Sequence, residues 1–528
     1  MTRALVALLL VAAAIAVCIG HGVATRPVMA DNQLYFFLTE RTASGVPPHV
    51  SMLDIKTHLS TLIGAAAMVV GRYFGVADVM SGRAASVAAA AVATVLAWLL
   101  GFELVASRTR EPGREWIAPL AGLVAAAATL AIHGLYYEAA TGFQPKVFMV
   151  AFLLAAHLAC ARRKPWLTGV AGMCSILCWQ PSGVVAAGCA LAAFLDRRAT
   201  WASIARTAVA ATLVLVAYEA WFAWEGALGA QVHQEFALAF GAQAKPFDWK
   251  ESTWFVMTEA QPYQSTAHPL PAAFTVVTAL MLVGAAARPR RTLEFLREEP
   301  GLVSFWTAAL LGMAFTLHDH QAHPDMLLVQ PYFAVSCGIG FGWLASLLAR
   351  VPAGRAIGAL ATLAFVAWEL QTARIDTRRW VAGPDSLDRQ LAQARLLDLY
   401  RDHRGSVWVM GSVHLLAFEH MDNWTPVGFP GRETADLDMK DYRPLRDGKM
   451  PEIIVSGRGL RPGGTTWLPV EYVDITPQVL ADDRIRVYSR RLGPGSGFDR
   501  GSAPVPRKGP EANRKPPPRK PPSGRQAP

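Results

Sequence analysis

The sequence predicts an α-helical polytopic membrane protein with about eleven transmembrane helices and a small external α/β domain near its C-terminus. Three observations support this prediction. The chain of 528 residues is 52% hydrophobic and only 17% charged, which is too apolar for a soluble protein of this length. Apolar runs long enough to cross a bilayer recur between positions 4 and 371. Beyond position 371 the composition changes to that of an ordinary soluble domain.

The expected transmembrane domain comprises residues 1–371, with a first external loop at 21–83. We expect the first apolar run to be retained as a helix, because the site at Val28-Met29-Ala30 that would suit a processing enzyme lies well beyond its end. The expected spans are 4–20, 84–105, 117–135, 145–161, 166–181, 183–195, 202–222, 270–287, 301–317, 326–349 and 356–371.

The distribution of arginines predicts the orientation of the chain. If the N-terminus is cytoplasmic and the apolar stretch 57–75 does not cross, the arginine clusters fall on inside loops, and the long outside loop 223–269 carries only Lys245 and Lys250. If 57–75 crossed, every later cluster would face outside. We therefore expect 57–75 to be an interfacial or re-entrant helix on the outer face of a multi-pass inner-membrane protein.

The C-terminal part is expected to be extracytoplasmic. A helical pattern at 386–402 precedes strand-like runs at 406–410, 452–456 and 484–489, which predicts an α/β domain over 372–495. Residues 496–528 contain nine prolines and eight Lys or Arg against two acidic residues, which predicts a disordered basic tail. The net charge of +10 thus reflects topology and a tail that suits membrane lipids, so no nucleic-acid partner is expected.

The first external loop is the strongest candidate for a site of chemistry. Asp31 stands just past the first span, and Asp54, Lys56 and His58 lie directly before the expected interfacial helix. Carboxylates are common in water at a membrane surface, so a solvated loop would account for the same residues.

These residues resemble the GT-C superfamily of membrane glycosyltransferases, in the branch of protein O-mannosyltransferases and aminoarabinose transferases. The resemblance covers roughly residues 1–371, and its motifs are short. Two departures stand out: Thr57-His58 replaces a Pro-Pro pair, and the acidic residue that opens the loop is single rather than paired. The matching positions are Asp31, Gly45-Val46-Pro47-Pro48, Lys56-Thr57-His58-Leu59, Phe74-Gly75, Arg83 before the second span, and the segment from His323-Pro324-Asp325 to Ala334.

The resemblance implies an inverting hexosyl- or pentosyltransferase that moves a sugar from a polyprenyl-phosphate carrier to a glycan, lipid or protein acceptor. Asp31 would take the proton of the acceptor hydroxyl, and a phosphate leaving group needs no general acid. Lys56, Arg83 and His323 would bind the phosphate, since fixed cations stabilise the charge that develops there. Asp54 and His58 would contribute further substrate contacts.

The metal content and two other functions stay open. Residues 318–325 include five potential metal ligands among eight residues, but their spacing matches no zinc pattern, so no metal ligand is assigned. No cofactor is required, and a divalent metal remains an alternative. A transporter or flippase of a lipid-linked substrate would suit the spans, although the sequence shows no internal repeat. A non-catalytic envelope-assembly protein is the third hypothesis.

Overall fold

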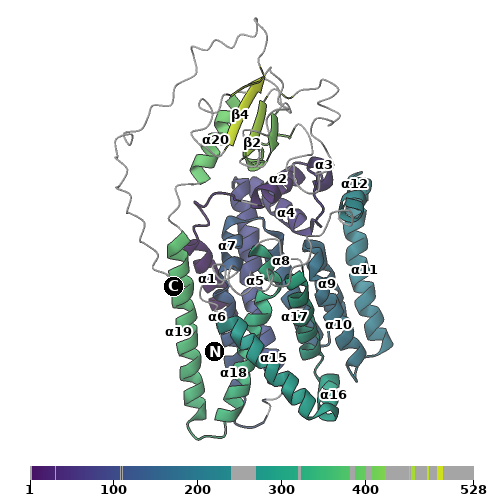
Figure 1. Ribbon diagram of the computed structural model, residues 1–528, viewed down its shortest axis with the longest axis vertical. Helices are drawn as coiled ribbons and strands as arrows, with labels where there is room; N and C mark the ends of the chain where they lie inside the picture. The colour runs from purple at the N-terminus through teal and green to yellow at the C-terminus, as the bar shows by residue number, and fades with distance from the viewer. Residues whose placement is uncertain are drawn as a thin grey trace, which may run out of the picture.

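The structure is a computed structural model of the whole chain. Figure 1 shows a bundle of long helices with a small domain containing a sheet at one end. The described residues are 3–29, 31–107, 109, 111–238, 269–318, 323–380, 387–399, 407–410, 412–423, 451, 453–457, 472–474 and 485–490.

The bundle contains the apolar runs of the sequence as helices, and each of the eleven expected spans overlaps at least one of them. Its helices are α1 (Arg3–Gly20), α5 (Asp78–Ala106), α6 (Ile117–Leu130), α7 (His133–Thr141), α8 (Pro145–Ala161), α9 (Pro165–Cys178), α10 (Gly183–Leu195), α11 (Trp201–Trp224), α15 (Pro269–Ala287), α17 (Pro300–His318), α18 (Gln330–Leu348) and α19 (Gly354–Trp380).

Length and composition identify a smaller set of candidate spans. Among the described residues, five helices are long and apolar enough to cross a membrane, and the bent pair α6 and α7, with an angle of 56° between its halves, makes a sixth. Helices α8, α9, α10 and α4 (Leu59–Tyr73) are apolar but shorter. The chain is therefore a multi-pass membrane protein, and the count of about eleven spans stays a prediction.

A layer of short elements covers the end of the bundle that faces the sheet. It consists of α2 (Asn32–Ala43), α3 (Pro48–Ser51) and α4, with α12 (Leu228–Val232) and the π-helical η2 (His233–Leu238) beside it. Helix α4 packs against α2 and α5. The stretch 57–75 thus contributes helix α4 to this covering layer, and its place on the outer face stays a prediction.

Small residues allow the central helices to approach closely. A Cβ atom added at Gly338 of α18 would lie 2.5 Å from the carbonyl oxygen of Ala121 in α6, and one added at Gly122 would lie 2.7 Å from that of Trp98 in α5. Neither contact is tolerable, so both positions require glycine. Helices α5, α6 and α18 therefore pack through small residues, as is common where lipid provides no hydrophobic driving force.

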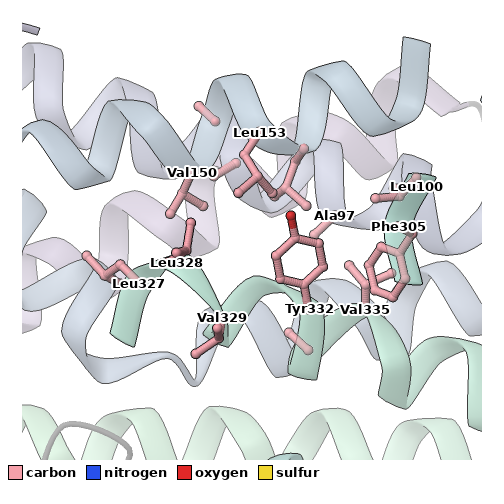
Figure 2. Packing of buried hydrophobic residues seen from close by; sticks show 14 of the residues in the cluster. Ala97, Leu100, Val150, Leu153, Phe305, Leu327, Leu328, Val329, Tyr332 and Val335 are labelled. Carbon is pink, nitrogen blue, oxygen red and sulfur yellow. The ribbon is translucent and has the colours of Figure 1, made fainter. Parts of the chain in front are cut away.

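A small network of polar side chains lies within the apolar interior of the bundle. Figure 2 shows Tyr332 of α18 pointing toward α8 among Val150, Leu153 and Phe305. Its hydroxyl lies 3.0 Å from Nε2 of His157, and Nδ1 of that histidine lies 3.1 Å from the Ser304 hydroxyl. These hydrogen bonds join α8, α17 and α18. They satisfy three polar side chains whose burial without partners would be unfavourable.

The small domain contains helices and a four-stranded sheet. The elements are α20 (Leu387–Leu399), β1 (Val407–Met410), α21 (His414–Phe418), β2 (Ile453–Gly457), β3 (Tyr472–Asp474) and β4 (Ile485–Arg490). The sheet order is β1-β2-β4-β3, with β1 and β2 parallel and the other pairs antiparallel. The expected helix and three strands each overlap one of these elements, whereas β3 was not expected. The predicted tail at 496–528 lies outside the described residues.

Candidate functional site

Asp31 lies at the N-terminal end of α2, on the layer between the bundle and the sheet. Its side chain is exposed and makes no capping hydrogen bond to the helix. The helix dipole favours negative charge at this end of α2, and the exposed position leaves the Asp31 side chain accessible. A carboxylate that is not used for capping is suited to accept a proton from a substrate.

Lys56 is the cation that the structure brings close to Asp31. Its ammonium group donates a hydrogen bond of 2.7 Å to the hydroxyl of Tyr35, one turn along α2 from Asp31. Burial lowers the pKa of Lys56, but interactions with Tyr35, Asp54 and Asp31 outweigh this and raise the pKa well above its ordinary value. The lysine is therefore a fixed positive charge near the exposed carboxylate.

A second carboxylate approaches the start of α2 from the bundle. The amide Nδ2 of Asn32 donates a hydrogen bond of 2.8 Å to Oε2 of Glu138 in α7, and both side chains are buried. Glu138 therefore brings a second carboxylate to the start of α2, near the acidic residue Asp31 that stands single where the resemblance implies a pair. Its place at the outer end of an apolar run was the only signal in the sequence.

Asp54 and His58 flank Lys56 but are buried behind it. The Lys56 backbone N–H donates a hydrogen bond of 3.3 Å to Oδ1 of Asp54, and Nε2 of His58 lies 3.7 Å from Oδ2 of Asp54. Burial lowers the pKa of His58 well below its ordinary value, and the neighbouring His49 and Lys56 lower it further. His58 is consequently a neutral imidazole, and both residues support the loop from within.

Arg83 is fully buried within α5, in the second turn of that helix. Its guanidinium donates to three backbone carbonyls, those of Thr141 at 3.0 Å, Val23 at 2.8 Å and Arg26. These bonds tie the segment after α1 to the end of α7. The contacts favour a role for Arg83 in holding the chain that leads to Asp31.

The segment that begins with His323 contributes an acidic residue, Asp325. His323 opens the 3₁₀ helix η5 (His323–Leu328), and its side chain lies outside the described residues. Asp325 forms a buried ion pair with Lys146 at the start of α8, and the Lys146 ammonium lies 4.6 Å from the centre of the Trp179 ring. The sequence analysis did not predict this pair. A metal ion at Asp325 would have to compete with the Lys146 ammonium group.

One cluster of described residues has the composition of a metal site. The ligand atoms of Glu40, Asp78 and His420 lie within 4.8 Å of one another. However, the guanidinium of Arg72 donates to Oε1 of Glu40 at 3.1 Å and to Oδ2 of Asp78 at 2.7 Å. A guanidinium already balances these carboxylates, so the donor set fits an ion-pair network better than a divalent cation.

The bundle, the covering layer and the small domain form a fold that is shared with a solved membrane protein. The structure is similar to that of ArnT from Cupriavidus metallidurans. The apo crystal structure matches with a TM-score of 0.58 and 12% identity, over 91% of this chain and 97% of that chain. The structure bound to undecaprenyl phosphate matches with a TM-score of 0.59 and 13% identity, over 93% and 99%.

These similarities confirm the expected α-helical membrane fold, while the number of spans and the placement of the C-terminal domain stay predictions. No protein-family model matches the sequence, and no curated protein does either. The fold is thus shared with a membrane protein whose structure holds a polyprenyl phosphate, and the identities of 12% and 13% are those of shared architecture.

Proposed function

We propose that the protein transfers a sugar from a polyprenyl-phosphate carrier to an acceptor on the outer face of the inner membrane. The observation that carries this proposal is the placement of the exposed Asp31 near the protonated Lys56, on the layer that covers one end of the bundle. The ArnT-like fold supports the choice of donor, because one ArnT structure contains undecaprenyl phosphate. The external domain would then be extracytoplasmic.

The proposed reaction needs one base and one fixed cation. Asp31 takes the proton of the acceptor hydroxyl as its oxygen attacks the anomeric carbon, and the bond from that carbon to the phosphate oxygen breaks on the opposite side. The electron pair leaves with the polyprenyl phosphate, whose charge Lys56 stabilises. This in-line displacement inverts the anomeric centre, and the acceptor is a glycan, a lipid or a protein.

Glu138 gives the acceptor end of the proposed site a second carboxylate. It reaches the start of α2 through Asn32, whose Oδ1 atom is buried without a hydrogen-bond partner. An acceptor that donates a hydrogen bond to this oxygen would remove the cost of leaving it unsatisfied. Arg83 and Asp54 then contribute indirectly, because they hold the two ends of the loop in place.

The test of this proposal is the replacement Asp31→Asn. Incubation of the purified wild-type protein with radiolabelled polyprenyl-phosphate sugars and envelope extract should yield free polyprenyl phosphate. In the variant, the rate of polyprenyl-phosphate release should be about 10²–10⁴-fold lower. Membrane insertion and melting temperature should not change. Glu225→Gln, which alters an exposed carboxylate at the C-terminal end of α11, serves as the matched control. Transfer by Asp31→Asn at the wild-type rate would refute the assignment.

A further inference from the structure

The segment that carries Lys56 has no regular secondary structure of its own. Residues 52–58 join α3 to α4 without a helical hydrogen-bond pattern, so bonds from other elements must hold them in place. Gln180 donates to the carbonyl of Ile55 at 3.0 Å, and the Thr57 hydroxyl donates to that of Ile176 at 3.1 Å. These contacts fix the side of the segment that faces α9.

Gln234 of η2 holds the same segment from the opposite side. Its Nε2 donates to the carbonyl of His49 at 2.8 Å, and its Oε1 accepts from the backbone N–H of Asp54 at 3.0 Å. These two backbone partners fix which end of the amide is oxygen. Nδ1 of His49, 3.0 Å from the same Oε1, must therefore carry a proton and donate it.

Glu235, the next residue, faces the other nitrogen of His49. Its Oε1 lies 3.0 Å from Nε2 of His49 and accepts from the Tyr218 hydroxyl at 3.1 Å, while its Oε2 accepts from Gln231 at 3.1 Å. The Tyr218 oxygen already accepts from the His58 N–H at 2.9 Å, so its own proton is directed at Glu235. A proton must consequently lie between Nε2 of His49 and Oε1 of Glu235. Both side chains are buried.

We infer that Gln234, itself braced by the His49–Glu235 pair, is a positioning residue that sets the place of Lys56 in the proposed site. Its hydrogen bond to Asp54 fixes the residue whose carboxylate accepts the Lys56 N–H, two positions along the chain. The brace joins the first external loop to η2, about 180 residues later in the sequence. Only the expected effect of Gln234 on sugar transfer rests on the proposed function.

A double-mutant cycle separates positioning from general stability. Gln234→Met keeps the bulk of the side chain and removes its hydrogen bonds, and it should lower kcat on the order of tenfold in the wild-type background. In a Lys56→Met background it should lower kcat by less than about twofold, because the group that it positions is gone. An equal loss in both backgrounds would overturn the inference.

The matched control is His157→Gln, which removes a buried histidine bonded to Ser304 and Tyr332 in the bundle. Any loss of kcat in this variant should be the same in both backgrounds, since the histidine lies on α8 rather than on the loop. If Gln234→Met does not fold, Tyr218→Phe gives the second test. It removes the bonds to His58 and Glu235 at little change in volume, and the same dependence on Lys56 is expected.

Chemical labelling of Lys56 tests the inference without any transfer assay. The rate of acylation by an amine-reactive reagent, read by mass spectrometry, should rise several-fold at Lys56 in Gln234→Met and stay constant at the exposed Lys164. Unchanged labelling of Lys56 would refute positioning even if the protein transfers sugars. Altered labelling in a protein that never releases polyprenyl phosphate would refute the proposed function and leave the positioning role standing.

Discussion

The two ends of α2 carry an acidic residue each, and the structure treats these residues in opposite ways. Asp31 at the N-terminal end is exposed and makes no capping hydrogen bond. Glu40 near the C-terminal end is completely buried, and its Oε1 accepts from Arg72 at 3.1 Å, from Ser44 at 2.7 Å and from His420 at 2.7 Å. One carboxylate remains available to a substrate, whereas the other is consumed in holding the protein together.

The middle of α2 explains why one helix can serve both purposes. Tyr35, Phe36, Phe37 and Leu38 are buried in one cluster with residues of α20, α21, β1 and β2. The small domain therefore packs directly on α2, the helix that begins next to Asp31, in addition to the ion pairs at Glu40. The small domain and α2 share a core, which means that the small domain stabilises the proposed site.

Removal of the buried acid should have the largest effect on stability. Glu40→Ala removes one of the two carboxylates that pair with Arg72 and deprives His420 of its closest partner. We expect a loss of about 3 kcal/mol, the lower range for breaking a buried ion pair, and faster tryptic release of the small domain. Glu40→Gln, which can still accept from Ser44 and Arg72, should lose much less. Equal proteolysis of both variants and the wild type would contradict the contrast between the two ends of α2.

An ion pair with one exposed partner, at the same end of α2, should matter less. The Arg41 side chain is only 8% exposed, whereas that of its partner Asp422 is 61% exposed. Arg41 also keeps Glu40 at 3.7 Å and donates from Nη1 to the His420 carbonyl at 3.5 Å. Asp422→Asn should therefore cost less than about 1 kcal/mol, measured as a small shift in melting temperature that high salt abolishes. A loss as large as that of Glu40→Ala would show that docking depends on the exposed pair.

The pH profile of transfer should show no effect of Lys56 in the neutral range. The pKa of Lys56 is raised, and a group with a raised pKa keeps its charge below its ordinary value and loses it only as pH passes the higher one. Between about pH 7 and 9, kcat should therefore not fall through deprotonation of this lysine. Lys56→Arg, which is always charged, should give a parallel alkaline limb. A fall in the wild type alone would contradict the prediction.

The sequence predicted the elements of this protein better than their contacts. Apolar length located the helices, because hydropathy is a local property. The prediction from the loop arginines that α4 does not cross the membrane stays a prediction. Asp31 and Lys56 could be selected because they lie in one segment between two apolar runs. The 56° bend between α6 and α7 was not expected, since the stretch 117–135 reads as one apolar run.

The partners of Glu138, Lys146 and Gln234 could not be predicted from the sequence. Each forms its defining hydrogen bond or ion pair with a residue more than 100 positions away, namely Asn32, Asp325 and Asp54. A polar residue at the end of an apolar run is usually solvated in the headgroup region. Only helix packing shows which of these residues turn inward.

By itself, the sequence determined a membrane-embedded bundle, a segment after the first apolar run with an acid and a lysine, and the small domain that follows the bundle. These features depend on hydropathy and charge, which act along the chain. Tertiary structure alone decided that Arg83 binds backbone carbonyls, that Glu40 is buried where Asp31 is exposed, and that Gln234 braces the segment of Lys56. The free energy of a charged side chain depends on its burial and its partners, and packing sets both.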